Sequence, residues 1–281
     1  MRSMLFVPAD RPERFAKAAT TGADALIFDL EDSVAPARKP LGREAIIAYL
    51  RDAPSGPKLL VRINPLSSDH HAADLAALQG LQPDGIMLPK AESAASVAML
   101  TSLLRAAKIN APILPIATET PRAIFGLGSY MDVAAELIGL TWGAEDLPAA
   151  IGALTSREAD GRYTPPYELA RSLTLFAAHA AGIEAIETVY PDFKDLDGLR
   201  AYAARACRDG FTGMMAIHPS QIPIINAAFT PADEAIAEAD AIIAAFAANP
   251  GVGALQFKGR MIDAPHLKQA QKLLQRVGKN A

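Results

Sequence analysis

The stretch LIGLTWGAEDLPAAIGAL, residues 137–154, decides how the rest of the chain is interpreted. It begins as an apolar run, continues as a helix of small residues, and carries Glu145 and Asp146 where the two meet. A buried strand that ends in polar residues and leads into a helix is the repeating unit of a parallel sheet covered by helices. We therefore expect these carboxylates at the carboxyl edge of such a sheet, where α/β enzymes place their chemistry.

The same unit recurs through most of the chain. Short runs rich in Val, Ile and Leu alternate with longer Ala-rich amphipathic segments, as buried strands and crossover helices do. The expected strands are residues 3–9, 23–31, 58–64, 85–91, 112–119, 135–142, 182–190 and 213–219. Eight such strands predict a TIM-type (β/α)8 barrel followed by a C-terminal helical extension.

An open, doubly wound sheet is the main alternative to the barrel. Its dinucleotide-binding form needs a glycine-rich turn after the first strand, whereas this chain reads PADRPER there, residues 8–14. A barrel also explains why one strand after another ends in polar groups, since it gathers all those ends on one rim. These groups are Asp29, Glu31, Asp32, Arg62, Asn64, Lys90, Glu119, Glu187, Tyr190 and His218.

Composition narrows the class of protein. The chain has 281 residues, is 51% hydrophobic and holds one cysteine, so we expect a large core without disulfides. We see no secretory signal and no apolar run near the roughly 18 residues that span a bilayer, and expect a cytoplasmic protein. A net charge of -4 and 6% aromatic residues argue against nucleic-acid binding.

The expected organisation is a barrel lyase domain at residues 1–230 and a helical extension at 231–281 that packs on the barrel or on a neighbouring subunit. The only candidate linker is AANPGVGALQFKGR, residues 247–260. Asp263 precedes the last helical segment, and its default role is the N-cap of that helix.

Glu119 and Asp146 follow neighbouring expected strands and could converge on one hard cation. The alternative is that Asp146 caps the helix after it while Glu119 pairs with Arg122. Zinc is disfavoured, because the five histidines are scattered.

Arg62 lies within a strand, where its guanidinium suits a carboxylate or enolate oxygen, or a structural salt bridge to Glu31 or Glu119. Lys90 could likewise hold a carboxylate network together. We interpret His218 as a rim histidine rather than a base. A basic cluster follows the first two strands and could receive phosphates. It comprises Arg11, Arg14, Arg38, Lys39 and Arg43.

Taken together, these segments resemble the citrate lyase β-subunit and HpcH/HpaI aldolase superfamily, in its acyl-CoA lyase branch. The motifs run through the whole chain in the family's order. They are RSMLFVPADRPERF, GADALIFDLEDSVAPARK, VRIN, MLPKAES, ATETPRAI, WGAEDLPAAIG, ETVYPDFKD, GFTGMMAIHPSQI, INAAFTPADEAIAEADAIIAAF and GRMIDAPHLKQAQKLL.

The resemblance implies roles for individual residues. Glu119 and Asp146 would bind Mg²⁺, Glu119 also facing the substrate, and Arg62 would contact the substrate carboxylate or carbonyl. Asp263 would reach a neighbouring subunit's site as acid or base. Glu31 would join Arg62 and Asp263 in the catalytic set by supporting the metal and its waters, with Asp32 beside it. Arg14 and Lys39 are the candidates for coenzyme A phosphates.

The implied reaction is retro-Claisen cleavage of a citramalyl-, malyl- or citryl-CoA thioester into an acyl-CoA and a 2-oxo acid, in a homotrimer or hexamer. Two departures from the family pattern, Glu187 for Asp and Met214 for Lys, are expected to bear on which acyl group is accepted. Two other functions stay open: a citrate lyase β subunit that acts only on acyl-carrier-protein thioesters, and a metal-dependent aldolase for free hydroxy-oxo acids. A thioesterase step after cleavage is left undecided.

Overall fold

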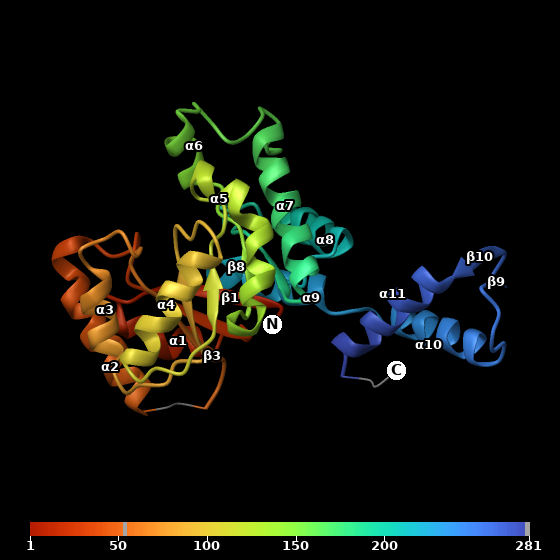
Figure 1. Cartoon of the computed structure of the whole chain (residues 1–281), viewed down its shortest axis with the longest axis horizontal. Helices are drawn as coiled ribbons and strands as arrows, with labels where there is room; N and C mark the ends of the chain where they lie inside the picture. Colours follow the sequence, from red (N-terminus) through yellow and green to blue (C-terminus); the bar gives the residue numbers. More distant parts are fainter. Residues whose placement is uncertain (53–54, 279–281) are drawn as a thin grey trace. The chain divides into compact units, whose positions relative to one another are not determined.

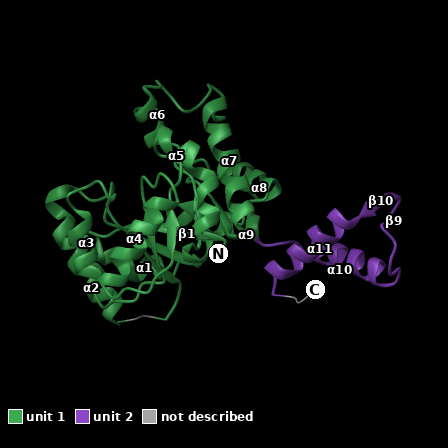
Figure 2. Cartoon of the chain, viewed as in Figure 1, with its two compact units in different colours: residues 1–229 green, residues 230–281 purple. Residues whose placement is uncertain are grey.

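The computed structural model describes residues 1–52 and 55–278. The chain forms two compact units, residues 1–229 and 230–281, coloured separately in Figure 2.

The first unit is built on eight strands, all paired in parallel, in the order β5-β4-β3-β2-β1-β8-β7-β6. They are β1 (Ser3–Pro8), β2 (Ala25–Asp29), β3 (Lys58–Arg62), β4 (Gly85–Leu88), β5 (Ile113–Pro115), β6 (Gly139–Thr141), β7 (Glu184–Glu187) and β8 (Gly213–Ala216). Two parallel bridges, Ile113 to Leu137 and Ile116 to Thr141, join the outermost strands. The predicted barrel is confirmed, and each of its strands is shorter than the predicted run.

Helices surround these strands (Figure 1). The α-helices are α1 (Phe15–Ala19), α2 (Lys39–Asp52), α3 (His71–Leu78), α4 (Ala94–Ala106), α5 (Pro121–Gly126), α6 (Asp146–Ile151), α7 (Pro165–Ala181), α8 (Leu196–Asp209) and α9 (Ile222–Phe229). The 3-10 segments are η1 (Pro12–Arg14), η2 (Pro36–Arg38), η3 (Leu127–Glu136) and η4 (Pro219–Gln221). Helix α8 shows how local residues set the ends of a helix. The Asp195 side chain accepts from the Gly198 N–H at its start, and Gly210, with a φ of 113°, ends it.

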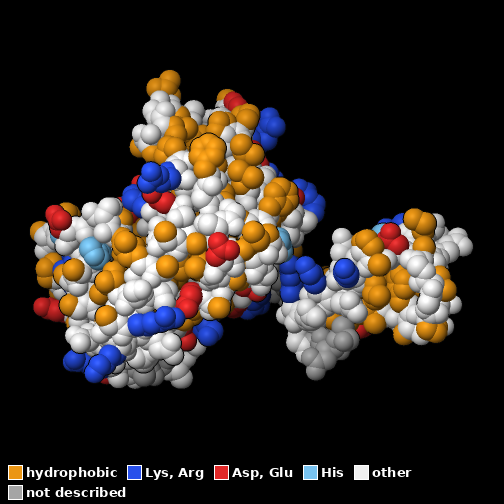
Figure 3. All heavy atoms as spheres, in the orientation of Figure 1, with side chains coloured by type: hydrophobic (Ala, Val, Ile, Leu, Met, Phe, Trp, Pro, Cys, Tyr) orange, Lys and Arg blue, Asp and Glu red, His pale blue; other side chains and the backbone are white. Residues whose placement is uncertain are grey.

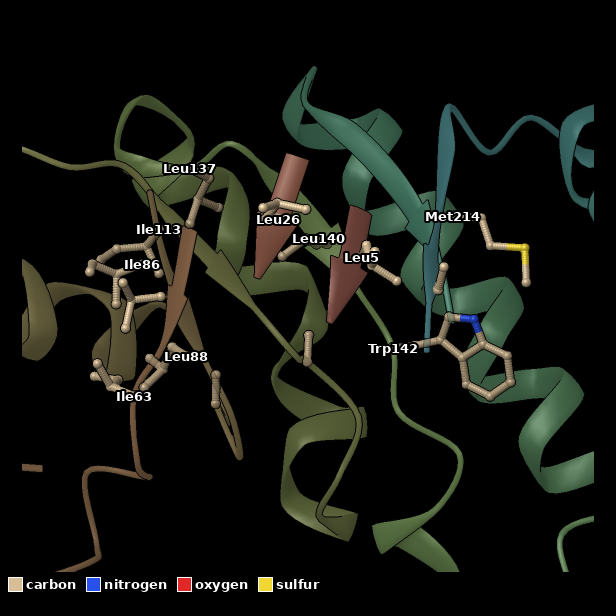
Figure 4. Packing of buried hydrophobic residues seen from close by; sticks show 14 of the residues in the cluster. Leu5, Leu26, Ile63, Ile86, Leu88, Ile113, Leu137, Leu140, Trp142 and Met214 are labelled. Atoms are coloured by element: carbon tan, nitrogen blue, oxygen red, sulfur yellow. The ribbon is translucent and has the colours of Figure 1, made fainter. Parts of the chain in front are cut away.

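Strand residues alternate between two apolar layers. The inner layer fills the barrel and includes Met4, Ile27 and Met215. The outer layer packs between strands and helices, as Figure 4 shows for Leu5, Leu26 and other buried side chains. Both layers are closed to water, so only the strand ends offer polar groups to a ligand.

The second unit is a helical hairpin with a small sheet. Helix α10 (Asp233–Ala247) packs against α11 (Ala264–Arg276) through a small core around Ala239, Ala270 and Leu274. Strands β9 (Ala254–Phe257) and β10 (Arg260–Asp263) form an antiparallel hairpin between the helices. The candidate linker at 247–260 thus lies inside this unit. Among the described residues, no helix combines the length and apolarity needed to cross a membrane.

Candidate active site

A cavity of about 240 Å³ opens at the carboxyl ends of the barrel strands. Strand-end residues form most of its wall, and Ile116 and Met215 also belong to the inner apolar layer. The polar and charged side chains that line it are Asp29, Asp32, Ser33, Arg62, Glu119, Glu145, Asp146 and Thr188. This is the rim that the sequence predicts.

Glu119 is held in the cavity wall by close packing and one strong hydrogen bond. Its side chain is 5% exposed, and the backbone N–H of Lys90 donates to its Oε2 at 2.5 Å. Burial raises the pKa of Glu119 to about 8, and nearby Glu31 and Asp146 push it the same way, against the Lys90 N–H. A buried carboxylate beside two others is a place where a cation is electrostatically favoured. The alternative pairing of Glu119 with Arg122 is not seen in the described residues, where Arg122 lies 3.6 Å from Glu92.

Asp146 does not cap the helix that follows it. Helix α6 begins at Asp146, and its N-cap residue, Glu145, makes no side-chain capping hydrogen bond. Instead, Oδ1 of Asp146 lies 3.3 Å from Nζ of Lys90, and the Asp146 side chain is 35% exposed. At the junction between strand β6 and helix α6, Glu145 and Asp146 therefore line the cavity and do not cap the helix.

Lys90 connects three acids through two different atoms. Its backbone N–H binds Glu119, while its Nζ lies 2.8 Å from Glu31 Oε1 and 3.3 Å from Asp146 Oδ1. The residue has a φ of 52°, a left-handed conformation that is uncommon outside glycine. The expected carboxylate network around Lys90 is therefore present.

Arg62, at the end of β3, is clamped by acids from β2 and the segment after it. Its Nε and Nη2 donate to Asp29 at 2.7 and 2.6 Å, and its Nη1 lies 3.0 Å from Glu31 Oε2. Burial alone would lower the pKa of Arg62, but Asp29 and Glu31 raise it above its ordinary value. The guanidinium keeps its charge, faces the cavity, and stacks on Phe6 at 4.8 Å. Arg62 thus forms the structural salt bridge with Glu31 and also lines the cavity.

Glu31 lies behind the cavity rather than in its wall. It is 4% exposed and contacts Arg62 and Lys90, and burial raises its pKa despite both cations. Its neighbour Asp32 does line the cavity. Glu31 can therefore act on the site by holding those two cations and by its negative charge near Glu119.

Lys39 is not a rim cation, contrary to the sequence prediction. Its side chain is 5% exposed, because Nζ donates to the backbone carbonyls of Leu30 and Glu31 at 2.7 and 2.9 Å. Two of its three N–H bonds fix the turn that carries Glu31, and burial keeps the ammonium away from a phosphate in solvent. Arg43 is likewise engaged, at 2.8 Å from Asp74.

The rest of the basic cluster stays exposed. Arg11, Arg14 and Arg38 lie on the segments that follow β1 and β2, and Arg38 is paired with Asp10 at 2.5 Å. Arg14 belongs to η1 and remains a candidate for an anionic ligand.

Neither departure from the family pattern faces the cavity. Glu187 is fully buried and accepts from Trp142, Arg171 and Tyr202, at 2.5, 2.7 and 2.9 Å. Met214 is fully buried in the outer apolar layer. Their expected influence on the acyl group is therefore wrong as a direct contact, because alternation along β7 and β8 directs both side chains away from the barrel interior.

Two other predictions concern histidine and the tail. His218 is the N-cap of η4, with Nδ1 2.7 Å from Ser220 Oγ, and stacks on Phe193 at 4.9 Å. This agrees with a rim histidine. Asp263 is the N-cap of α11 in the second unit, and its side chain is 38% exposed.

Sequence reasoning missed Gly143, which makes room for Glu119, and Trp142, in the cavity wall. It expected Asp29 on the rim but did not predict that Asp29 orients Arg62. Asp29 carried a signal, since it ends the second strand as Arg62 ends the third, and the two are register partners.

The donor set fits magnesium better than a soft metal. Glu119 and Asp146 offer carboxylate oxygens at one cavity, and carboxylates with water and substrate oxygens are what Mg²⁺ prefers. In the described part of the chain, no group of three or more His, Cys, Asp and Glu side chains is placed to hold a metal. Water and substrate would have to complete the shell.

Comparisons with known proteins identify the family of this chain. A sequence model of the family described as HpcH/HpaI aldolase/citrate lyase matches residues 2–219. A Mycobacterium tuberculosis citrate lyase subunit beta-like protein is 44% identical over 276 residues, covering 98% of this chain and 94% of the relative. An L-malyl-CoA/beta-methylmalyl-CoA lyase of Cereibacter sphaeroides is 34% identical, with 98% and 94% covered.

A solved structure extends the likeness to three dimensions. The crystal structure of M. tuberculosis CitE with magnesium, acetoacetate and coenzyme A has a TM-score of 0.81 and 42% identity, and the match covers 99% of this chain and 98% of that one. The chain belongs to the HpcH/HpaI aldolase/citrate lyase family. It is a carbon–carbon lyase of that family.

Proposed function

We propose that this lyase uses Mg²⁺ to cleave a 3-hydroxy-3-carboxyacyl-CoA, of the citramalyl-, malyl- or citryl-CoA type, into an acyl-CoA and a 2-oxo acid. The observation that carries the proposal is one cavity, at the carboxyl ends of the barrel strands, lined by Glu119, Asp146 and Arg62. The magnesium and coenzyme A bound by the M. tuberculosis structure support it.

Glu119 and Asp146 would hold the metal. A bound magnesium ion supplies Lewis acidity that makes the substrate hydroxyl easier to deprotonate. The chain's own part is to keep two carboxylates together against their repulsion. Lys90 does this by hydrogen bonding to one acid and by its charge beside the other.

Arg62 stabilises the negative charge that develops on the substrate as the C–C bond breaks. Asp29 and Glu31 hold the guanidinium in place before substrate arrives, so little reorganisation is needed during reaction. A preorganised donor of this kind typically contributes roughly 3 to 4 kcal/mol to transition-state stabilisation.

Asp263 would deliver the proton to the enolate carbon of the acyl-CoA product, or remove it in the reverse direction. It lies in the C-terminal unit, and we propose that it serves the barrel of a neighbouring subunit. Coenzyme A would lie along the rim, with Arg14 as the phosphate contact.

A homo-oligomer, trimer or hexamer, is part of the proposal. Hydrophobic side chains gather over α5 and α7 on the face shown in Figure 3. Phe125, Leu169 and Phe176 on these helices are 91%, 56% and 65% exposed. Apolar surface of this kind is typical of an interface. Light scattering should give three or six times the 29.6 kDa of one chain.

The test is a substrate panel. Purified protein is incubated alone with malyl-, citramalyl- and citryl-CoA, with and without Mg²⁺, and release of the 2-oxo acid and of free coenzyme A is followed. We expect metal-dependent cleavage of at least one thioester, abolished in Glu119→Gln and Asp146→Asn and retained in the exposed control Asp160→Asn.

Other outcomes would redirect the assignment. Turnover only after addition of an acyl carrier protein would favour a lyase subunit that needs a carrier. Turnover of free hydroxy-oxo acids but of no thioester would favour an aldolase. Free thiol appearing after cleavage would reveal a thioesterase step. Full activity in chelated buffer would remove the metal from the mechanism.

A further inference from the structure

The side chain and the backbone N–H of Asp263, the proposed proton donor, both contact the same ring nitrogen of His266. His266 is the third residue of α11, and its Nδ1 lies 2.6 Å from Oδ1 of Asp263 and 3.2 Å from the backbone nitrogen of Asp263. Both side chains are partly exposed, 38% for Asp263 and 45% for His266. Solvent can therefore reach the pair.

The 2.6 Å contact is a hydrogen bond in either of two protonation states. When Nδ1 carries the hydrogen, it donates to the Asp263 carboxylate; when Oδ1 carries it, the acid donates to Nδ1. In the second state the one lone pair of Nδ1 accepts from the acid and is shared with the backbone N–H of Asp263, whose nitrogen lies 3.2 Å away. One hydrogen can thus move between the two side chains without leaving either without a partner.

Helix capping alone does not call for a histidine here. In a capping box the third helical residue is ordinarily Glu or Gln, which accepts from the N-cap backbone. Within the described residues, Nε2 of His266 makes no hydrogen bond, and the ring lines a cavity of about 510 Å³ in the same unit. The charged groups that share this cavity are Glu234 and Glu238 of α10 and Arg260 of β10. Glu238 is paired with Arg260 and Lys258, whereas no ion pair engages Glu234 in the described chain.

We propose that His266 resupplies the proton that Asp263 delivers to the enolate carbon. This inference rests on the proposed function of Asp263. In the cleavage direction, the Oδ1–H bond of Asp263 breaks as the C–H bond of the acyl-CoA forms. Nδ1 of the neutral ring then takes a proton from water or buffer and becomes imidazolium. That Nδ1–H bond breaks as the Oδ1–H bond of Asp263 re-forms, which restores the starting state before the next turnover.

The matched test is His266→Gln, because glutamine preserves the capping box and cannot relay a proton. Assayed as the full-length protein with Mg²⁺ and the thioester of the panel that it cleaves fastest, this variant should lose kcat by roughly tenfold, with KM within about twofold of wild type. Its thermal unfolding should be unchanged. In His266→Ala, added imidazole should restore a large part of kcat, and it should restore none in Asp263→Asn.

Wild-type kcat in His266→Gln would overturn the relay and leave His266 a capping residue, as would a His266→Ala defect that imidazole does not reduce. Asp263→Asn separates this failure from that of the proposed function. If Asp263→Asn is inactive while His266→Gln is not impaired, Asp263 is the donor and only the relay is lost. If Asp263→Asn keeps wild-type kcat, the role of Asp263 fails and the relay with it.

Discussion

Gly143 lies so close to Glu119 that a Cβ added to it would be 2.9 Å from Cγ of Glu119 and 3.2 Å from its Oε1. Real Cβ atoms are essentially never found below 3.0 Å from another heavy atom. Glycine at this position therefore sets where one of the two proposed metal ligands can lie.

Gly143→Ala is expected to displace the Glu119 carboxylate and to weaken Mg²⁺ binding by about tenfold or more, a misplacement penalty typical of preorganised sites. Calorimetric titration of metal-free protein with Mg²⁺ measures this directly. Gly128→Ala is the matched control, since nothing lies within 4 Å of its added Cβ. Equal metal affinity in the two variants would contradict the role assigned to Gly143.

Subunit sharing can be tested by mixing two inactive variants. Arg62→Ala disables the barrel cavity and Asp263→Asn disables the tail, so a hybrid oligomer contains some intact pairs of barrel and tail only if the pair spans two subunits. We expect partial recovery of activity in mixed oligomers, verified by mass, and none when either variant is unfolded and refolded alone. Verified hybrids without activity would place Asp263 and Arg62 of one chain in the same site.

Glu187 is expected to matter for stability rather than for substrate choice. It is the buried acceptor for Trp142, Arg171 and Tyr202, so Glu187→Gln leaves the Arg171 guanidinium without that carboxylate. Breaking a buried ion pair in this way destabilises by about 3 kcal/mol. Urea unfolding should show the loss. Glu184→Gln, earlier on β7 and partly exposed, should change the unfolding free energy by less than about 0.5 kcal/mol.

Asp209 is expected to add stability that acid removes. Burial alone would raise its pKa, but the hydrogen bond and charge of Arg171 outweigh burial and hold the pKa below its ordinary value. The folded chain then binds fewer protons than the unfolded chain near the unfolded pKa of about 3.9. The contribution of Asp209 is therefore complete above that pH and is lost as the pH falls through the folded-state pKa.

The measurement compares urea unfolding of wild type and Asp209→Asn across this range. Near neutral pH the variant should be less stable by about 1.5 to 3 kcal/mol, the range for a hydrogen bond to a charged group. The difference should shrink below about pH 4. Asp197→Asn, whose side chain is 95% exposed, is the control. A difference that stays constant into strong acid would contradict the assignment.

The barrel could be predicted because its signal is local and repeated. Each strand buries alternate residues in two apolar layers, so it reads as a continuous apolar run. The strand ends were less predictable: the predicted strand at residues 112–119 runs on to Glu119, whereas β5 ends at Pro115 and Glu119 lies in the cavity wall. The hairpin of β9 and β10 was missed because its strands are short and mostly exposed.

The roles of the charged residues depended on contacts that spacing does not give. Lys39 and Arg14 are both basic residues that follow an early strand, but the Lys39 ammonium donates to the backbone carbonyls of Leu30 and Glu31, nine and eight residues earlier. Glu187 ends β7 and Glu119 follows β5, but the side chain of Glu187 points to the surrounding helices, where it contacts Arg171. The resemblance placed residues at the rim, and only the packing shows which of them face the cavity.

Lys90 has a further consequence for anyone who wishes to retune this lyase. Because Glu119 is held by the main chain at position 90, no replacement other than proline removes that hydrogen bond, and glycine would even relieve the left-handed backbone. The charge facing Glu31 and Asp146, by contrast, belongs wholly to the side chain. Substitutions at position 90 should therefore change the electrostatic potential of the pocket while the hydrogen bond to Glu119 stays in place.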